Sequence, residues 1–408
     1  MTAEPTTPEP PAEPPRGEPP TFAEDITGIR ADWRQAVLVP LLAVLTALII
    51  GALILVLTDP DLWRILRNTP GEYLGAAWDS VSGAYSALFN GAFGSPRAIS
   101  ETLVSASPVI LAGLSVAVGF RAGLFNIGGE GQIIVGGMTA VMVGIKLTAI
   151  PFPFLALLTL AGGILGGAVW GGISGLLKAR TGAHEVITTI MLNFIALFGA
   201  LWLLKTDFFR VPDRADPVSQ SIDEAARYPR LLEFFDDQLR VHFGIVLAIL
   251  AAFFVYWLLF KSTIGYQFRA VGFNPHAARY GGMRVATLYV AVMAVAGGLA
   301  GMAGSDTVQG ILYRGTPGFS AGIGFDAIGI ALLGRSHPAG VVLAGLLFGA
   351  LEAGGREMQA SVFIPIDLVQ VIQALVIVFI AAPALIRGLY RIRGAADDAA
   401  QVSTGWGS

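Results

Sequence analysis

The chain of 408 residues contains no cysteine, few charged residues (13%) and only four lysines. Without cysteine it has no disulfide, no thiolate metal ligand and no thiol nucleophile. A soluble domain carries about twice this charged fraction. No lysine follows a glycine, so the Gly-Lys-Ser/Thr phosphate loop of an ATPase is absent.

Catalytic patterns are also missing. His184-Glu185 has no second histidine four residues after the first, so the zinc-protease pattern fails. The four histidines are scattered, and no nucleophile lies beside a base in the sequence. We therefore predict no enzyme, no catalytic residue, no metal site, no cofactor bound by this chain and no nucleic-acid partner.

What the chain has in abundance is apolar residues, at 54%, with a mean hydropathy of +0.67. Several windows hold 18 or more nearly uncharged residues, enough to cross a bilayer. The 51 glycines suit helices that pack backbone to backbone inside a membrane. These features predict an all-α, polytopic membrane protein.

We expect about ten transmembrane helices, one of them short or broken. The predicted spans are 36–57, 99–120, 133–145, one that ends near 177, 185–204, 243–260, 285–303, 323–334, 341–354 and 362–386. Pro108 is expected to break the second span. Residues 62–90 are expected to form helices at the outer interface, and 304–322 an outer loop.

Basic loops set the expected orientation, because they favour the cytoplasmic side. This rule places both termini and the loop 261–284 in the cytoplasm, and the long polar loop 205–242 outside. Residues 1–30, rich in proline and glutamate, are predicted to be a disordered tail, either solvated or a docking arm. The membrane domain is expected to span 31–393, followed by a tail at 394–408.

The loop 261–284 carries four basic residues and no carboxylate. A short helix is predicted inside it, because Asn274 is a good N-cap and Pro275 suits the first helical position. Gly281 and Gly282 can end this helix in the left-handed conformation. Taken alone, the loop is either a solvated connection or a helix that docks into another protein.

Three motifs stand in an order that resembles the permease subunits of bacterial ABC importers for simple sugars, nucleosides and branched-chain amino acids. They are FRAGLFNIGGEGQ at 120–132, GAHEVITTIMLNFIA at 182–196, and GYQFRAVGFNPHAARYGGM at 265–283 with GFDAIGIALLG at 324–334. The resemblance covers about 99–386, and the sequences of the first two motifs are most similar to those of the nucleoside branch. Residues 1–30 and 205–242 lie outside it.

The resemblance implies that the predicted short helix is the coupling helix, which docks into a separate ATP-binding subunit. Its residues here are Asn274, Pro275, His276, Ala277, Ala278, Arg279 and Gly281. His276 stands where the family commonly has an acidic residue. Further implied partners are a second permease, identical or related, an extracytoplasmic binding protein and the lipid bilayer. The implied location is the bacterial inner or plasma membrane, and ATP is used only by the partner subunits.

A nucleoside-binding site is expected to contain amides, hydroxyls and an aromatic ring face. Asn126, Gln132 and Asn193 are uncharged polar residues in or beside apolar runs, and they are our pathway candidates, with Phe125 as a stacking face. Bonds between helices are the alternative for the amides, and a core- or lipid-facing ring is the alternative for Phe125. Glu130 is a further candidate, with a helix-end role as the alternative.

Two other functions remain open at this point. An ABC permease for a simple sugar such as ribose differs only in substrate. An ion-coupled secondary transporter is less favoured, because carriers of that kind usually place ionisable residues within their spans. The carboxylates seen here, Glu101, Glu130, Asp326, Glu352 and Asp367, lie near predicted span ends.

Overall fold

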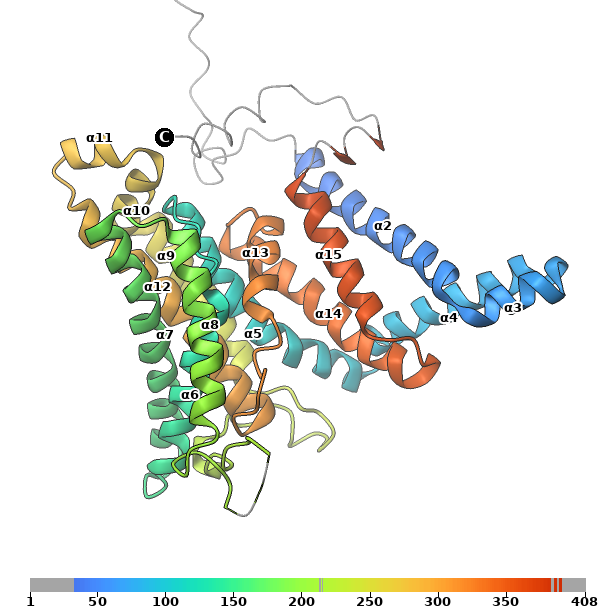
Figure 1. Cartoon of the computed structure of the whole chain (residues 1–408), viewed down its shortest axis with the longest axis horizontal. Helices are drawn as coiled ribbons and strands as arrows, with labels where there is room; N and C mark the ends of the chain where they lie inside the picture. Colours follow the sequence, from blue (N-terminus) through green and yellow to red (C-terminus); the bar gives the residue numbers. More distant parts are fainter. Residues whose placement is uncertain (1–32, 213, 215, 383–384, 387–388, 391–408) are drawn as a thin grey trace, which may run out of the picture.

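The computed structural model describes residues 33–212, 214, 216–382, 385–386 and 389–390 (Figure 1). The predicted tails 1–30 and 394–408 lie outside these residues. Within the described residues the chain is helical, with two isolated β-bridges and no sheet. The α-helices are α2 (Trp33–Thr58), α3 (Pro60–Asn68), α4 (Tyr73–Phe93), α5 (Pro96–Arg121), α6 (Gly129–Lys146), α7 (Phe154–Thr181), α8 (Glu185–Leu203), α9 (Gly244–Lys261), α10 (Thr263–Phe273), α11 (Pro275–Tyr280), α12 (Val285–Asp306), α13 (Ile323–Leu333), α14 (Pro338–Val362) and α15 (Asp367–Ala381).

Seven of the described helices are long and apolar enough to cross a membrane: α2, α5, α7, α8, α9, α12 and α14. The apolar helices α13 and α15 are shorter, and α6 has 18 residues that include Glu130, Gln132 and Lys146. The all-helical membrane fold is therefore confirmed, whereas the count of ten crossings and the side of each terminus stay predictions.

Helix α12 lies at the centre of the bundle and packs on α5, α6 and α7. Helix α5 is the most buried span, and it also contacts α9, α13 and α14. In Figure 1, α6 to α9 and α12 stand side by side and α13 to α15 lie beside them, whereas α2 packs on α15, α4 packs on α14 and α3 lies at the outer edge. Helix α11 lies at one end of this bundle, which we call the α11 end, and residues 205–242 cover the opposite end.

Glycines let α7 and α12 approach backbone to backbone. A Cβ atom added to Gly167 of α7 would lie 2.6 Å from the Cα atom of Gly301 in α12. One added to Gly301 would lie 2.9 Å from the Cα atom of Gly167. Since the opposing atoms are backbone, no side chain can move aside, and any larger residue would separate the helices. This is the close packing predicted for a glycine-rich membrane protein.

Helix α5 runs without interruption through Pro108, so the predicted break at this proline was wrong. Proline cannot donate a hydrogen bond to the carbonyl four residues earlier, which belongs to Val104. The Ser107 hydroxyl oxygen lies 3.3 Å from that carbonyl, but its single hydrogen is directed to the Asp306 carboxylate, 2.5 Å away. Membrane helices often continue through a proline, because neighbouring groups adjust around the freed carbonyl.

Several predicted boundaries were also wrong. The predicted loop 304–322 begins as helix, because α12 continues to Asp306 and a π-helical turn, Thr307–Leu312, follows. The predicted span 341–354 belongs to the longer α14, and the last described helix, α15, starts at Asp367 rather than near 362. In the segment predicted to lie at the outer interface, α4 packs against α14, and its position relative to the membrane stays a prediction.

Residues 205–212 and 216–242 lie against one end of the bundle and form a cover over it. The Ser219 N–H donates to the Gly315 carbonyl at 2.9 Å, and the Gln309 side chain donates to the Ala226 carbonyl at 2.6 Å. Arg240 pairs with Glu101 at the start of α5, at 3.2 Å. These bonds attach the segment to α5, to the π-helical turn and to the loop after it.

Candidate functional site

The short helix α11 has the ends that its sequence predicts. The Asn274 side chain accepts hydrogen bonds from the backbone N–H groups of His276 and Ala277, at 2.9 and 3.0 Å. Pro275 occupies the first helical position, and Gly282 follows the helix with a φ of +82°, which favours glycine. Gly281 has a φ of −73°, so the prediction of a left-handed conformation was right for Gly282 and wrong for Gly281. The N-cap of this helix is therefore the one that the local sequence predicts.

Helix α11 presents a mixed aromatic and basic surface. Ala278 is buried against the bundle, whereas the flanking Phe273 and Tyr280 are 90% and 97% exposed. His276 and Arg279 are exposed as well. Tyrosine and arginine are typical anchors of protein–protein interfaces. The sequence analysis missed both aromatic residues, although their positions beside the predicted caps could have marked them.

Helix α10 holds α11 in position. Phe268 and Val271 of α10 are buried in the main core, with exposures of 1% and 2%. The N-terminus of α10 is capped by Ser262, whose hydroxyl oxygen accepts from the Gly265 N–H at 3.0 Å. Because α10 is anchored along its buried face, α11 extends from a fixed base at this end of the bundle.

The three predicted pathway amides come together around the loop between α5 and α6. The side chains of Asn126 and Gln132 bond each other twice, and the oxygen of Asn126 also accepts from the Gly128 N–H at 3.0 Å. Asn193 of α8 accepts from the Gly131 N–H at 2.8 Å and donates to the Ile127 carbonyl at 2.9 Å. All three side chains are buried, and these bonds shape the loop.

Glu130 lies at the start of α6 and binds the start of α13. Its carboxylate accepts hydrogen bonds from the Ser320 hydroxyl at 2.5 Å and from the N–H groups of Gly322 and Gly324 at 3.3 and 2.9 Å. A carboxylate at a helix N-terminus satisfies otherwise free N–H groups and complements the helix dipole. The structure therefore shows the helix-end arrangement, although the cap belongs to α13.

Phe125 is half-buried and stacks on Phe120, with ring centroids 5.1 Å apart and an interplanar angle of 19°. It lies next to Asn126 in the same loop. Of the five predicted pathway residues, Phe125 and Glu130 keep partly exposed surface, whereas the three amides are enclosed.

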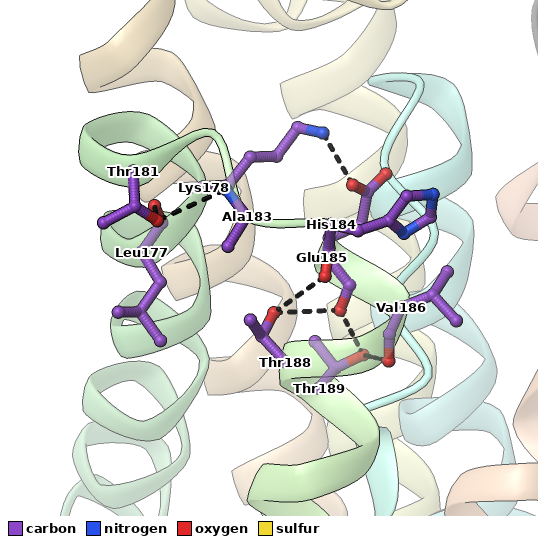
Figure 2. Close-up of polar contacts among 9 residues, drawn as sticks. All are labelled: Leu177, Lys178, Thr181, Ala183, His184, Glu185, Val186, Thr188 and Thr189. Atoms are coloured by element: carbon purple, nitrogen blue, oxygen red, sulfur yellow. Dashed lines mark hydrogen bonds and ion pairs between the residues drawn. The ribbon is translucent and has the colours of Figure 1, made fainter.

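The turn between α7 and α8 carries a second polar group, drawn in Figure 2. The Lys178 ammonium lies 2.6 Å from the Glu185 carboxylate, and the lysine also lies over the ring of Tyr289 in α12, at 5.3 Å. The Thr189 hydroxyl donates to the Glu185 carbonyl at 2.7 Å and holds the first turn of α8. This pair fastens the HEVITT motif to α7 and α12.

The opposite end of the bundle contains a buried pair that the sequence analysis missed. Asp306 of α12 is fully buried, accepts from the Ser107 hydroxyl at 2.5 Å, and lies 3.7 Å from the Nδ1 atom of His242. Burial and the nearby charge of Arg240 lower the pKa of His242 to about 4. Asp306 escaped notice because the sequence predicted a loop there.

Three further carboxylates near the predicted span ends lie beside arginines or at the start of a helix. Glu101 pairs with Arg240, as described above, and with Arg356 at 3.8 Å. Glu352 lies one turn before Arg356, at 3.7 Å. Asp367 starts α15. Across the described residues, no three metal-binding side chains gather at one place.

Comparisons with known proteins identify the family to which the chain belongs. The family model for the permease component of the branched-chain amino acid transport system matches residues 98–381. The guanosine ABC transporter permease protein NupP of Bacillus subtilis is 38% identical over 351 residues, which are 86% of this chain and 94% of the relative.

Two further relatives match over similar lengths. The nucleoside ABC transporter permease protein NupB of Lactococcus lactis is 34% identical, covering 86% of this chain and 92% of its own. The glucose ABC transporter permease protein TsgB13 of Haloferax volcanii is also 34% identical, covering 84% and 86%. No solved structure matches the chain.

Proposed function

Because the chain belongs to the family of permease components of branched-chain amino acid transport systems, we propose that it is the transmembrane permease of an ABC importer that carries nucleosides. Two relatives that match most of its length are named for guanosine and nucleoside transport. As a member of this family the chain is an integral membrane transport component and not an enzyme.

The observation that carries this proposal is the exposed, capped helix α11. An importer permease without a phosphate-binding loop has to receive energy from ATP hydrolysed by another subunit. Helix α11 offers that subunit a short, capped helix, Asn274 to Gly281, with the exposed Phe273 beside it. The permease itself binds no cofactor in this proposal, and ATP acts only in the partner.

In this assignment the α11 end faces the cytoplasm, since residues 261–284 are basic. Both chain termini then lie in the cytoplasm, and the cover formed by 205–242 faces outward. A binding protein delivers the substrate to that outer end. Two permeases, identical or related, and two ATP-binding subunits complete the assembly in the cell membrane.

Transport proceeds by alternating access, and the loop between α5 and α6 forms part of the pathway wall. Asn126, Gln132 and Asn193 keep this loop in shape, while the half-buried Phe125 and Glu130 have surface left for a substrate. A transient site of this kind needs little affinity, because the permease only has to favour different states before and after release.

The direct test is purification of the tagged chain from its native membrane in mild detergent. We expect an ATP-binding subunit in a fixed ratio to this chain. In Arg279→Glu we expect that subunit and nucleoside uptake to be lost, because the change reverses the charge of an exposed residue on α11. Arg67→Glu is the matched control: Arg67 is an exposed arginine at the end of α3. A chain that purifies alone and takes up substrate in response to an ion gradient would establish the ion-coupled transporter instead.

A simple sugar such as ribose is the second candidate substrate, favoured by the glucose permease among the relatives. Competition separates the two. Uptake of labelled guanosine that is blocked by unlabelled nucleosides, and not by ribose or glucose, supports the nucleoside assignment. The reverse pattern supports a sugar permease and leaves the ABC assignment intact.

A further inference from the structure

Residues 121–130, which link α5 to α6, lie in backbone contact with the segment that carries α11. A Cβ atom added to Gly272 would lie 2.7 Å from the carbonyl carbon of Ala122, and one added to Gly123 would lie 2.8 Å from the Cα atom of Gly272. Gly123 also has a φ of +67°. Since Gly272 stands two residues before Asn274, the N-cap of α11, this contact lies directly at the base of that helix.

The same ten residues hold both ends of α13. Glu130 binds the N–H groups of Gly322 and Gly324 at the start of α13, as described above. At the other end, the Arg121 guanidinium donates from Nε to the Ser336 carbonyl at 3.0 Å and from a terminal nitrogen to the Arg335 carbonyl at 3.2 Å. Helix α13 is therefore attached at both ends to the segment 121–130.

The start of α13 also meets this segment without an intervening side chain. A Cβ atom on Gly324 would lie 2.7 Å from the carbonyl carbon of Gly129. Between the two glycine contacts, the bonds of Asn126 with Gln132 and of Asn193 with Ile127 and Gly131 keep the loop in one shape. A displacement at Gly272 therefore cannot be absorbed by a side-chain rotation or by a slack loop.

We propose that residues 121–130 transmit movement of α11 to α13, so that α13 is the element displaced in the ATP-driven cycle. The inference rests on the proposed function, because it takes α11 as the docking helix. It adds a route that packing alone supports: α11 to Gly272, Gly272 to Gly123, and residues 121–130 to both ends of α13. Shifts of one helix relative to its neighbours are among the known switching movements of proteins, and measured coupling is what establishes a route.

A cysteine reporter tests this route, because the natural chain has no cysteine to interfere. Phe325 of α13 is 49% exposed in the single chain, and Phe325→Cys is the reporter position for maleimide labelling of the purified complex in nanodiscs. The labelling rate is measured without nucleotide and after trapping with ATP and vanadate. We expect the two rates to differ in the reporter chain, and the difference to be lost when Gly272→Ala is added, with the ATP-binding subunit still bound.

Two more variants make the test specific. Glu130→Ala leaves the glycine contact at Gly272 and removes the carboxylate bonds to α13, so it should also abolish the rate difference, even if Gly272→Ala fails to fold. Gly199→Ala is the matched control, because a Cβ atom at this position of α8 meets nothing within 4 Å. It should keep the full difference.

The outcomes separate the inference from the proposed function. A Gly272→Ala or Glu130→Ala chain that keeps the full rate difference overturns the route. Loss of the ATP-binding subunit from Gly272→Ala also overturns it, because the glycine would then belong to the docking surface. A reporter chain that never binds an ATP-binding subunit overturns the proposed function, and the route with it.

Discussion

The side-chain amides of Asn126 and Gln132 face each other and exchange two hydrogen bonds, with N···O distances of 3.0 and 3.1 Å. Both residues are 1% exposed. Each amide donates one hydrogen bond to the other and accepts one from it. The oxygen of Asn126 also accepts a hydrogen bond from the Gly128 N–H. The loop between α5 and α6 therefore closes on a polar pair with little access to water.

Asn126→Ala should destabilise the protein by about 1–3 kcal/mol, because the Gln132 amide and the Gly128 N–H are then buried without partners. Thermal unfolding in detergent measures the effect as a lower midpoint. Asn90→Ala is the control, since Asn90 is exposed and its amide makes one bond of 3.3 Å to Ser86. Equal midpoints for the two variants would contradict a structural role for the pair.

Tyr280→Ala and Phe273→Ala should each weaken binding of the ATP-binding subunit by about tenfold or more, the size expected when a large aromatic anchor is truncated. The measurement is the amount of that subunit retained on the tagged permease after washing. Trp78→Ala, which removes an aromatic residue that is 71% exposed on α4, should change nothing. If both α11 variants retain the partner fully, the docking surface lies elsewhere.

Gly301→Ala should destabilise the bundle by about 1–3 kcal/mol, because the added methyl group collides with the backbone of α7. Gly172→Ala in α7 is the matched control, since its Cβ atom would meet only Ala294, at 3.9 Å. Thermal unfolding of the two variants under one set of conditions decides the matter. A smaller loss for Gly301→Ala than for the control would show that the helices separate easily.

Acidification should loosen the cover formed by 205–242. The pKa of His242 lies at about 4, below its ordinary value of 6.5, so the folded cover holds this ring neutral. As the pH falls from about 6.5 to about 4, the unfolded segment takes up a proton that the folded one does not. The stabilisation present above pH 6.5 is therefore lost over this range, by about 3 kcal/mol in total.

Hydrogen exchange or limited proteolysis of the cover at pH 7 and pH 4.5 tests this expectation. His242→Asn should flatten the dependence on pH, and the exposed His276→Gln should leave it unchanged. A cover that tightens at low pH would show that protonated His242 forms an ion pair with Asp306, which lies 3.7 Å away.

The sequence predicted those features that depend on neighbouring residues in the chain. The caps of α11 are an example, since Asn274, Pro275 and Gly282 act on groups within a few residues. The continuation of α12 beyond Gly304 was missed, because its support comes from distant parts of the chain. Gln309 donates to the carbonyls of Ala156 and Ala226, and no local pattern shows those bonds.

The candidate site shows the same division. Polarity within an apolar run singled out Asn126, Gln132 and Asn193, and the structure does bring them together. Their bonding to one another and to the loop backbone depends on how α8 packs against α6, which composition does not reveal. Glu130 was placed at the right helix end, but its partner helix α13 lies almost two hundred residues later.

The glycine contact between α7 and α12 limits how this protein can change shape. With Gly167 against Gly301 and no side chain between them, the two helices have no soft layer that would let one slide along the other. We expect α7 and α12 to tilt and shift together as one rigid unit. The bending needed to open the bundle first to one side and then to the other then has to occur outside this helix pair, in the segments that connect it to the other helices.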